Sequence, residues 1–243
     1  MIMEDKTGKV IKLSVVIPCY NEEQTLQKCI EKVLKISDEN LHLEIIIVDG
    51  GSTDGSLSIA NDLAKKDSRI TVMQHYKNQG KGAALQTGFK KAIGEFIAIQ
   101  DADLEYNPKD ILKLLEPLIS KEADVVFGSR LLPYGPHRVL FFWHSLGNRF
   151  LTLISNMFTN LNLTDMEVGY KIFVREVIQN ITIEEKRFGF EAEITAKVAR
   201  LGCRIYEMGI SYYGRTYKEG KKITWKDGIR ALWCIIKYNL WKR

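Results

Sequence analysis

Asp101 and Asp103 are the two residues of this 243-residue chain whose types and spacing most directly indicate chemistry. They follow Phe96–Ile99, an apolar run that is too short for a helix and therefore predicts a buried strand. Residues two apart in an extended chain point the same way, so we expect the two carboxylates to lie side by side and to repel each other unless a cation lies between them. Oxygen ligands of this kind suit Mg²⁺ or Mn²⁺ carrying a diphosphate. The alternative is a polar turn in which Asn107-Pro108 opens the next helix.

Carboxylates also follow two other predicted strands. Glu22 comes after the strand Leu13–Ile17, and Asp49 comes directly after the strand Glu44–Val48. Ligands of open α/β sheets bind beside the carboxyl ends of the strands. Acidic groups gathered at that edge suit the hydroxyls of a ribose, an N–H of a base and a metal ion, and they suit phosphate only through a cation.

Two glycine-rich turns, GGSTDG at residues 50–55 and NQGKG at residues 78–82, follow the second and third predicted strands. Each places backbone N–H groups near a helix N-terminus, which is a common anion site. Neither contains the G-x-x-x-x-G-K-[ST] pattern, and no G-x-G-x-x-G follows the first strand, which counts against P-loop enzymes and dinucleotide-dependent dehydrogenases. The need for glycine's backbone freedom in tight turns is the alternative explanation.

The elements that must position these groups alternate along the chain. Apolar runs predict strands at residues 13–17, 44–48, 70–74, 96–99 and 124–128, and helical spacing predicts helices near residues 25–36, up to about 66, up to 92 and at 109–120. Strands that alternate with helices through short turns indicate an α/β fold with a mostly parallel sheet and helices on both faces. We therefore expect one α/β domain over residues 1–220, followed by a basic amphipathic helix over residues 221–243 that is either part of the domain or an appendage on a membrane surface.

Composition narrows the class of protein. Hydrophobic residues make up 45% of the chain, which is enough for a full core. The net charge of +5 is concentrated after Lys218 and favours anionic partners, a membrane surface or phosphates, over nucleic acid. The four cysteines lack C-x-x-C spacing and indicate reduced, cytosolic thiols instead of zinc ligands or disulfides. The N-terminus lacks the apolar stretch of a signal peptide, and no run approaches the roughly 18–20 apolar residues that span a bilayer.

Five segments, in this order, carry a resemblance to a known family: VVIPCYNEEQTL, IIIVDGGSTDGS, NQGKGAALQTGF, IQDADLEYNP and VVFGSRL. Together they resemble family-2 glycosyltransferases of the GT-A fold. The later segments FGFEAEI and YYGRTYKEGKKITWKDG are similar to the dolichyl-phosphate mannosyltransferase-like branch, which moves a sugar from a nucleotide donor to a polyprenyl phosphate. The resemblance implies metal-dependent, inverting transfer of a hexose, from a donor of the GDP-mannose or UDP-glucose type, by a protein associated with the cytoplasmic face of a membrane.

Site residues follow from the resemblance together with the charges in the chain. Contacts to the nucleotide sugar are expected from Pro18, Tyr20, Glu22, Asp49, Lys81, Asp101, Ala102 and Asp103. The metal, Mg²⁺ or Mn²⁺, is expected on Asp101, Asp103 and Glu105, and the acceptor phosphate on Arg130 and Lys171. Asp103, Arg130 and Lys171 are the expected catalytic residues. Two departures matter: Gly50 stands where many relatives have a second acid, and Glu105 stands where the mannosyl enzymes often carry Gln, so the sugar is left open.

The acceptor decides which side chains the reaction needs. A phosphate monoester, with a second pKa of about 6, is already ionised near neutral pH and needs cations for placement. A sugar hydroxyl, as in polysaccharide or glycolipid assembly, would need a general base, for which Asp165 and Glu191 are candidates. Further cationic candidates on the acceptor side are Arg138, His144 and Arg149. A sugar-nucleotide pyrophosphorylase would need a glycine- and arginine-rich loop after the first strand, which PCYNEEQTL is not, and a non-catalytic nucleotide-binding protein is the remaining alternative.

Two apolar stretches raise the question of a membrane. Residues 138–158 are rich in aromatic and aliphatic residues, and after Trp225 apolar residues recur at steps of three and four, with Lys226, Arg230 and Lys237 off that stripe. Tryptophan and lysine beside an apolar face are typical of a helix at a membrane surface. Packing into the core and formation of a homodimer explain the same pattern.

Overall fold

The computed structural model describes residues 10–132, 138–139, 141–216 and 225–241. Along the chain it contains β1 (Ile11–Cys19), α1 (Leu26–Leu34), β2 (Leu41–Asp49), α2 (Ser56–Lys66), β3 (Ile70–Gln74), α3 (Lys81–Lys91), β4 (Phe96–Ile99), α4 (Lys109–Ile119), β5 (Val125–Ser129), α5 (Phe142–Thr159), β6 (Lys171–Val174), α6 (Arg175–Gln179), α7 (Phe190–Arg200), β7 (Ile205–Gly209), α8 (Trp225–Ile236) and the π-helix η2 (Lys237–Trp241). The predicted alternation of strands and helices is confirmed, and β3 and β4 have the predicted bounds.

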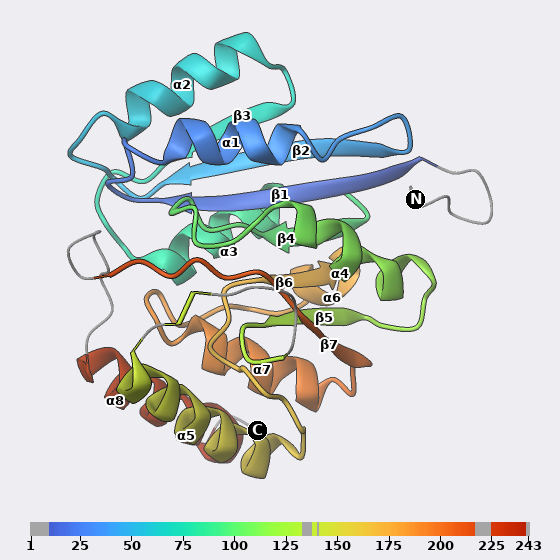
Figure 1. The fold of residues 1–243 in the computed structure, drawn as a ribbon, viewed down its shortest axis with the longest axis vertical. Helices are drawn as coiled ribbons and strands as arrows, with labels where there is room; N and C mark the ends of the chain where they lie inside the picture. Colours follow the sequence, from blue (N-terminus) through green and yellow to red (C-terminus); the bar gives the residue numbers. More distant parts are fainter. Residues whose placement is uncertain (1–9, 133–137, 140, 217–224, 242–243) are drawn as a thin grey trace.

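Seven strands form one sheet in the order β3-β2-β1-β4-β6-β5-β7 (Figure 1). Strand β1 pairs in parallel with β2 and β4, and β5 pairs in parallel with β7. Strand β6, which the sequence pattern did not reveal, runs antiparallel to both β4 and β5. The α/β fold with a mostly parallel sheet is therefore confirmed.

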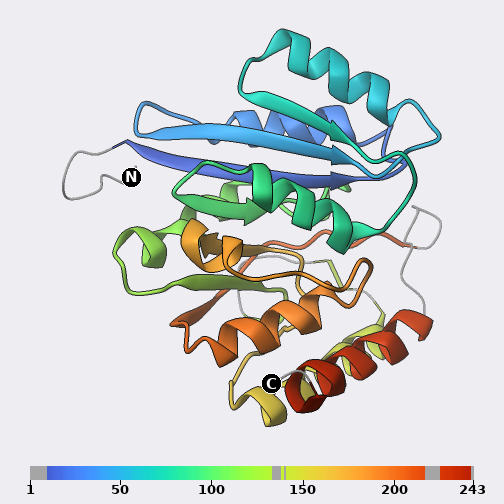
Figure 2. The ribbon, with the colours of Figure 1, turned by 180° about the vertical axis from the view of Figure 1, so that it is seen from behind.

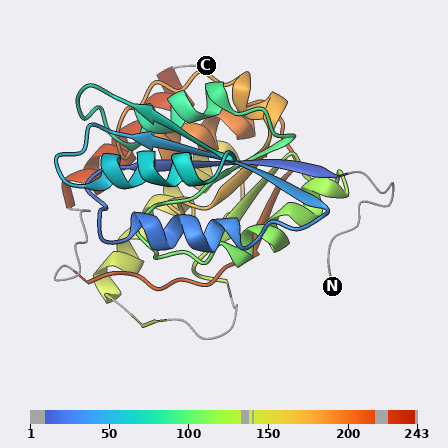
Figure 3. The ribbon, with the colours of Figure 1, turned by 90° about the horizontal axis from the view of Figure 1, so that it is seen from above.

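Helices cover both faces of the sheet, as Figures 1 and 2 show: α1 and α4 lie on one face, and α3, α6 and α7 on the other. Seen from above in Figure 3, the sheet runs between these two layers. Because β1 and β2 are covered on both sides, their side chains are apolar almost without interruption, and Val15, Val16 and Ile46 are fully buried. This core fixes the carboxyl ends of β1, β2 and β4 at one edge of the sheet.

Helices α5 and α8 pack against each other and against α7, to one side of the sheet (Figure 1). On α8, Ala231, Cys234 and Ile235 are buried. Helix α8 starts at Trp225, so Lys218 and the first residues of the predicted appendage lie outside the described residues. The buried face shows that the described part of the C-terminal segment packs onto the rest of the fold.

Glu185, in the loop before α7, ties α8 and η2 to that loop. Its Oε1 accepts hydrogen bonds from Lys237 Nζ at 2.8 Å and from Tyr238 Oη at 2.9 Å, and its Oε2 accepts one from Arg230. Burial opposes ionisation of this carboxyl, but the hydrogen bonds from Lys237, Arg230 and Tyr238 lower its pKa to about 2. A buried carboxylate with three donors is thus the polar attachment point of the C-terminal helices.

The cysteines and the lengths of the helices bear on two expectations about the chain as a whole. The cysteines are free thiols, and Cys19, Cys29 and Cys234 are buried. Among the helices that the structure describes, none combines the length and the apolar character needed to cross a bilayer.

Candidate active site

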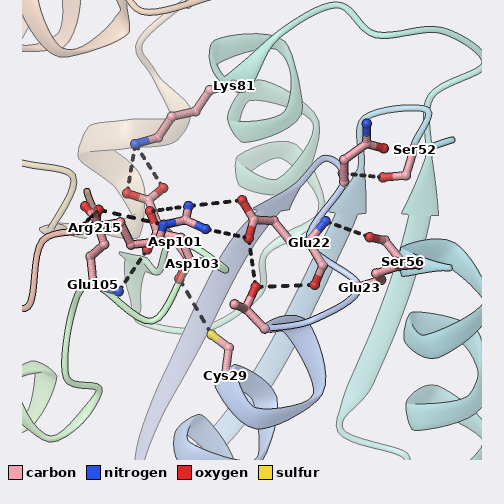
Figure 4. A network of polar contacts seen from close by, with 12 residues as sticks. Glu22, Glu23, Cys29, Ser52, Ser56, Lys81, Asp101, Asp103, Glu105 and Arg215 are labelled. Atoms are coloured by element: carbon pink, nitrogen blue, oxygen red, sulfur yellow. Dashed lines mark hydrogen bonds and ion pairs between the residues drawn. The ribbon is translucent and has the colours of Figure 1, made fainter. Parts of the chain in front are cut away.

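Five carboxylates gather at the carboxyl edge of the sheet: Glu22, Asp49, Asp101, Asp103 and Glu105. We call this set the acidic edge. The register of the parallel strands brings it together, because Cys19 at the end of β1 pairs with Asp49 at the end of β2, and β4 ends beside β1. Figure 4 shows four of these acids in one network of polar contacts, joined by Lys81 and Arg215. The predicted convergence of Glu22, Asp101 and Asp103 at this edge is therefore seen in the structure.

Asp49 is fully buried at the end of β2 and is only half used. Its Oδ2 accepts hydrogen bonds from the backbone N–H groups of Gly51 at 2.9 Å and Ser52 at 3.0 Å. Its Oδ1 is buried, and no partner for it is found among the described residues. An unpaired buried acceptor costs free energy, so this oxygen is suited to receive an N–H from a ligand. Nearby, Pro18 is half-buried, Ala102 is buried, and Tyr20 is exposed at the same edge.

Asp101 is held by a lysine. Lys81, the first residue of α3, places its Nζ 2.9 Å from Asp101 Oδ1, 3.1 Å from Asp101 Oδ2 and 3.2 Å from Glu191 Oε1. Burial lowers the pKa of Lys81, but the Asp101 and Glu191 carboxylates raise it more, so the ammonium stays charged. A Cβ at Gly169 would lie 2.3 Å from Asp101 Oδ2, so only glycine leaves room for this carboxylate. The charge of Asp101 is therefore already compensated within the protein.

The backbone around Asp103 corrects one prediction. We expected Asp101 and Asp103 to continue the strand in extended form, but β4 ends at Ile99 and residues 102–105 form turns and bends. Leu104 has a φ of +64°, a left-handed conformation that is uncommon for such a residue. The backbone N–H of Glu105 donates to Asp103 Oδ1 at 3.0 Å, which closes the turn. The two aspartates are neighbours because of this turn and not because of strand periodicity.

Asp103 lies among other carboxylates of the acidic edge. Burial and the nearby carboxylates of Asp101 and Glu105 raise its pKa to about 7, although Arg215 opposes the shift. Glu105 is engaged through both oxygens, since Oε2 accepts from Tyr212 Oη at 2.9 Å and Oε1 accepts from the backbone N–H of Arg215 at 2.7 Å. Carboxylates crowded in this way are stabilised by any cation that reaches them.

These oxygen donors fit a divalent ion that arrives with its substrate. In the part of the chain that the structure describes, no three His, Cys, Asp or Glu side chains are grouped so that they could hold a metal ion, and the expected set of Asp101, Asp103 and Glu105 therefore does not form such a group. Mg²⁺ does not need such a group, because it is held by one or two carboxylates together with substrate phosphates and water. Asp103 and Glu105 are the carboxylates best placed to hold it, since Lys81 already serves Asp101.

Arg215 is a site residue that our reading of the sequence missed. It lies in the extended segment after β7, which runs alongside the loop after β4: Tyr212 forms an isolated bridge with Tyr106, and the N–H of Tyr213 donates to Glu105 O at 2.9 Å. The only signal was the motif YYGRTY, and without β7 there was no way to place it. The long-range pairing of β7 with β5 brings this arginine to the acidic edge.

A second set of charges lies beside the acidic edge: Arg130, Asp165, Glu167, Lys171 and Glu191. We call it the charge cluster. Arg130 forms a forked ion pair with the buried Asp165, with Nε to Oδ2 and Nη2 to Oδ1 both at 2.7 Å, and its guanidinium lies 5.3 Å from the ring centre of Tyr212. Burial disfavours both charges, yet the attraction raises the pKa of Arg130 and lowers that of Asp165. Asn148 of α5 donates to Asp165 Oδ1 at 2.8 Å, which fixes the pair further.

Lys171, which we expected to hold the acceptor phosphate together with Arg130, is engaged within the protein. It is fully buried in β6, its Nζ donates to the carbonyl oxygens of Met166, at 3.0 Å, and Val168, and it lies 4.6 Å from the ring centre of Phe127. Burial lowers its pKa to about 8, against the effect of nearby carboxylates including Glu191. In this arrangement Lys171 supports the segment that carries Asp165 and does not face a ligand.

Glu167 and Glu191 each keep one buried oxygen for which no partner is found within the described ranges, Oε1 of Glu167 and Oε2 of Glu191. Burial and the charge of Glu191 raise the pKa of Glu167 to about 8. Of the remaining cationic candidates, Arg138 donates to Gly214 O at 3.0 Å, His144 contacts Phe141, and Arg149 is exposed on α5. The cluster thus contains two carboxyls with free acceptor capacity beside one arginine that is already paired.

Comparison with known proteins decides the family. Residues 14–182 match the sequence profile described as Glycosyl transferase family 2. The chain belongs to this family. Among curated glycosyltransferases, the undecaprenyl-phosphate mannosyltransferase of Micrococcus luteus is 29% identical over 223 residues, covering 87% of each chain. Glycosyltransferase AglD of Haloferax volcanii is 28% identical over 85% of this chain, which spans 34% of AglD.

Solved glycosyltransferases share the fold. Glucosyl-3-phosphoglycerate synthase from Mycobacterium tuberculosis, in complex with Mn²⁺, uridine diphosphate and glucosyl-3-phosphoglycerate, matches with a TM-score of 0.74 and 20% identity, covering 97% of this chain and 81% of that chain. Another structure of that enzyme contains Mg²⁺ and uridine diphosphate and matches with a TM-score of 0.72. This likeness establishes a GT-A-type architecture, and the family membership establishes that the chain is a glycosyltransferase.

Proposed function

We propose that this glycosyltransferase uses a divalent metal ion to move a hexose, with inversion, from a nucleotide sugar of the GDP-mannose or UDP-glucose type to a polyprenyl phosphate. One observation carries the donor side: the buried Asp49 Oδ1, which lacks a partner among the described residues, lies at the same sheet edge as the crowded carboxylates of Asp101, Asp103 and Glu105. The relative from Micrococcus luteus, named for transfer of mannose to undecaprenyl phosphate, supports the acceptor class.

At the donor, each residue of the acidic edge has a distinct task. Asp49 accepts an N–H of the base through Oδ1, while Pro18, Tyr20 and Glu22 line the nucleoside. Asp103 and Glu105 hold Mg²⁺ or Mn²⁺, which when bound neutralises charge on the departing diphosphate. Lys81 keeps Asp101 in place and adds a positive charge beside the diphosphate. The protein therefore needs no acid to protonate the leaving group.

At the acceptor, the phosphate needs placement and not deprotonation. Arg130 is the candidate for this grip, because Asp165 fixes its Nε and Nη2 and so orients the rest of the guanidinium. Lys171 contributes from beneath, by holding the carbonyl groups of Met166 and Val168 on either side of Glu167. An oriented arginine fork suits a phosphate better than a point charge does.

Transfer to a sugar hydroxyl is the second candidate, and the unpaired oxygens of Glu167 and Glu191 favour it. Glu167, whose pKa is raised to about 8, is mostly protonated near neutral pH and would take a hydroxyl proton only in its ionised form. Asp165 is a poor base, because Arg130 and Asn148 hold it ionised and occupied. The identity of the acceptor therefore separates a reaction centred on Arg130 from one centred on Glu191 or Glu167.

Helices α5 and α8 suit contact with the cytoplasmic face of a membrane. On α5, Phe142, Trp143 and Met157 are 68%, 76% and 72% exposed, and on the neighbouring C-terminal helices Ile229 and Trp241 are 60% and 64% exposed. Large apolar side chains grouped on two adjacent helices mark an interaction surface, and tryptophan favours the lipid–water boundary. We propose peripheral binding to lipid here, with a homodimer as the alternative occupant.

Flotation with phospholipid vesicles tests the membrane proposal. The wild type and an Ile93→Ser control, changed at an exposed isoleucine between α3 and β4, should float with the vesicles. Phe142→Ser/Trp143→Ser should stay in the soluble fraction. The surface is a dimer interface if neither the wild type nor the double variant binds vesicles and if sedimentation shows a dimer of the wild type that the double variant does not form.

The transfer itself is tested with purified protein, a panel of nucleotide sugars and a short polyprenyl phosphate, with Mn²⁺, with Mg²⁺ or with chelator. We expect a glycosyl phosphoprenol of inverted configuration, detected by mass spectrometry and NMR, only when metal is present. Product on a sugar hydroxyl but none on the phosphate would select the second candidate. Turnover that is undiminished in chelator would overturn the metal dependence.

A further inference from the structure

The guanidinium of Arg215 lies inside the acidic edge (Figure 4). Its Nη1 and Nη2 are each 3.2 Å from an oxygen of Glu22, its Nη2 is 3.4 Å from Asp103 Oδ2, and its Nε is 3.8 Å from Glu105 Oε1. These are the acids that the proposed function assigns to the nucleoside and to the metal. One protein cation thus contacts three carboxylates at the position where a substrate cation is expected.

The contacts of Arg215 are weak for an arginine in such company. The pairs with Glu22 and Asp103 are longer than the 2.7 Å fork between Arg130 and Asp165. Its Nε is buried and has no hydrogen-bond partner within the described part of the chain. A guanidinium that belonged permanently to these acids would form shorter hydrogen bonds than the two at 3.2 Å to Glu22, as charged pairs in proteins do. Arg215 is therefore held by the negative charge of the acidic edge more than by well-formed hydrogen bonds.

We infer that Arg215 is a donor-binding residue which rests on Glu22 and the metal's carboxylates when no donor is bound, and which moves to the donor's diphosphate when the nucleoside and the metal take those carboxylates. The inference rests on the proposed function, since it requires a metal–diphosphate donor. It adds a residue to the donor site and states what that residue does before the donor arrives.

Two physical arguments carry the exchange. A divalent ion bound to Asp103 and Glu105 would lie beside the guanidinium, and like charges repel strongly in a partly buried site. The metal also brings the diphosphate, whose oxygens can form shorter hydrogen bonds to the planar fork of an arginine than the present contacts at 3.2–3.4 Å to Glu22 and Asp103. Arg215 thus loses one set of partners and gains a better one in the same event.

Glu105 links the two states. Its Oε1 accepts the backbone N–H of Arg215 at 2.7 Å, so a metal ion that takes this oxygen weakens the contact that places the arginine. The segment before it has independent anchors, with Ile210 N donating to Ser129 O at 3.0 Å and Ser211 N donating to Asp110 Oδ2 at 2.8 Å. The segment before Arg215 therefore stays attached to the sheet when the arginine moves.

The test measures Mn²⁺ binding from the EPR signal of the free ion, first without nucleotide and then with UDP or GDP. Arg215→Gln should bind Mn²⁺ alone about tenfold more tightly than the wild type, since the competing cation is gone. The same variant should bind the Mn²⁺–nucleotide complex about tenfold more weakly, since it lacks the group that grips the diphosphate. Arg215→Lys keeps the charge, so its affinity for Mn²⁺ alone should stay near that of the wild type.

Arg204→Gln is the matched control, because Arg204 pairs with Asp124 on the exposed surface and should leave both affinities unchanged. Arg215→Gln should also melt at a lower temperature in chelator and regain more than the wild type does when Mn²⁺ is added. Equal affinity of wild type and Arg215→Gln for Mn²⁺ alone overturns the competition, and unchanged binding of Mn²⁺–nucleotide overturns the transfer. A wild type that binds no Mn²⁺ even with nucleotide contradicts the metal-dependent function instead, so the two failures are distinct.

Discussion

The acidic edge and the charge cluster are adjacent, yet they are built in opposite ways. At the acidic edge, Asp49 and Asp103 keep unpaired acceptor capacity or uncompensated charge, and the acids come from the ends of neighbouring parallel strands. In the charge cluster, Arg130 and Lys171 are already engaged by the protein itself. The edge is thus ready for a ligand that brings positive charge, whereas the cluster must share groups that it already uses.

This difference separates two kinds of functional residue. A residue whose partner is a ligand destabilises the free protein, in which that partner is missing. Replacing it therefore costs little or no stability. A residue that the fold has paired is costly to remove for structural reasons before any effect on the reaction is felt. Variants of the two regions should therefore differ in whether activity or stability responds first.

The largest effect on activity is expected at the acidic edge. Asp103→Asn removes the charge that holds the cation, so turnover should fall about a thousandfold or more, as expected for loss of several kcal/mol of transition-state stabilisation. Its melting temperature should not fall, because the change relieves repulsion from Asp101 and Glu105. Asp62→Asn, on the exposed surface of α2, is the control. Near-full activity of Asp103→Asn would remove this residue from the metal site.

Arg130→Ala should show the opposite order, with stability affected first. It leaves the buried Asp165 without its ion-pair partner, which costs about 3–5 kcal/mol in the free energy of unfolding. The exposed pair of Arg204 with Asp124 has the same forked geometry, but water screens it, so Arg204→Ala should destabilise the protein far less than Arg130→Ala does. Denaturant unfolding measures both.

Kinetics on the folded fraction of the Arg130 variants then test the acceptor role. Arg130→Lys should raise the acceptor KM or lower kcat about tenfold or more, with donor affinity almost unchanged, because a point charge cannot reproduce the fork. Slow hydrolysis of the donor by water should persist. Equal loss of donor affinity and acceptor use would exclude the acceptor assignment.

Asp49→Asn should weaken binding of the nucleoside diphosphate by about 1.5–3 kcal/mol, the usual cost of losing a hydrogen bond to a charged group. The amide oxygen can still accept from Gly51 and Ser52, but the amide nitrogen would replace the free acceptor Oδ1 with a donor. Asp54→Asn in the same turn is the control, since the Asp54 carboxylate accepts hydrogen bonds from the backbone N–H groups of Ser56 and Glu23 and not from the expected ligand. Calorimetry that gives the same affinity for Asp49→Asn and the wild type would place the base elsewhere.

The smallest effect is expected away from both regions, at Glu185. Its folded pKa, about 2, lies below its ordinary value of 4.5, so its contribution to stability is complete above about pH 4.5 and is lost as the pH falls toward 2. Glu185→Gln should therefore lose about 1–3 kcal/mol near pH 7 and show a weaker decline in acid than the wild type. Glu176→Gln, at an exposed glutamate of α6, should follow the wild type. Parallel acid profiles of Glu185→Gln and the wild type would contradict the assignment.

The contrast between the two regions also explains which parts of the candidate site could be predicted from the sequence. Strand ends are local properties, so the pattern placed Glu22, Asp49 and Asp101 at one edge of the sheet correctly. The turn at Leu104 is not a property of periodicity, and so the extended geometry assumed for Asp103 was wrong. The reason Asp103 and Asp101 remain close is the turn itself.

The charge cluster could not be assembled in the same way. The ion pair of Arg130 with Asp165 and the burial of Lys171 depend on β6 joining the sheet next to β5. In the same way, Arg215 reaches the acidic edge because β7 pairs with β5. These pairings join residues far apart in the chain, and no spacing in the sequence records them. Types and local order of residues were predictable, but which charges neutralise one another was not.

Asn148 gives the proposed acceptor site a direct connection to the surface of the molecule. It belongs to α5, the helix that exposes Phe142 and Trp143, and it holds Asp165, the partner of Arg130. If α5 lies on a bilayer, a lipid-linked phosphate meets its arginine without leaving the membrane plane. The rate would then follow the mole fraction of the carrier in the vesicle and not its amount per volume of solution. Diluting the carrier with inert phospholipid at constant total carrier should slow the reaction, and a rate that stays constant would show that the carrier reaches the enzyme through water.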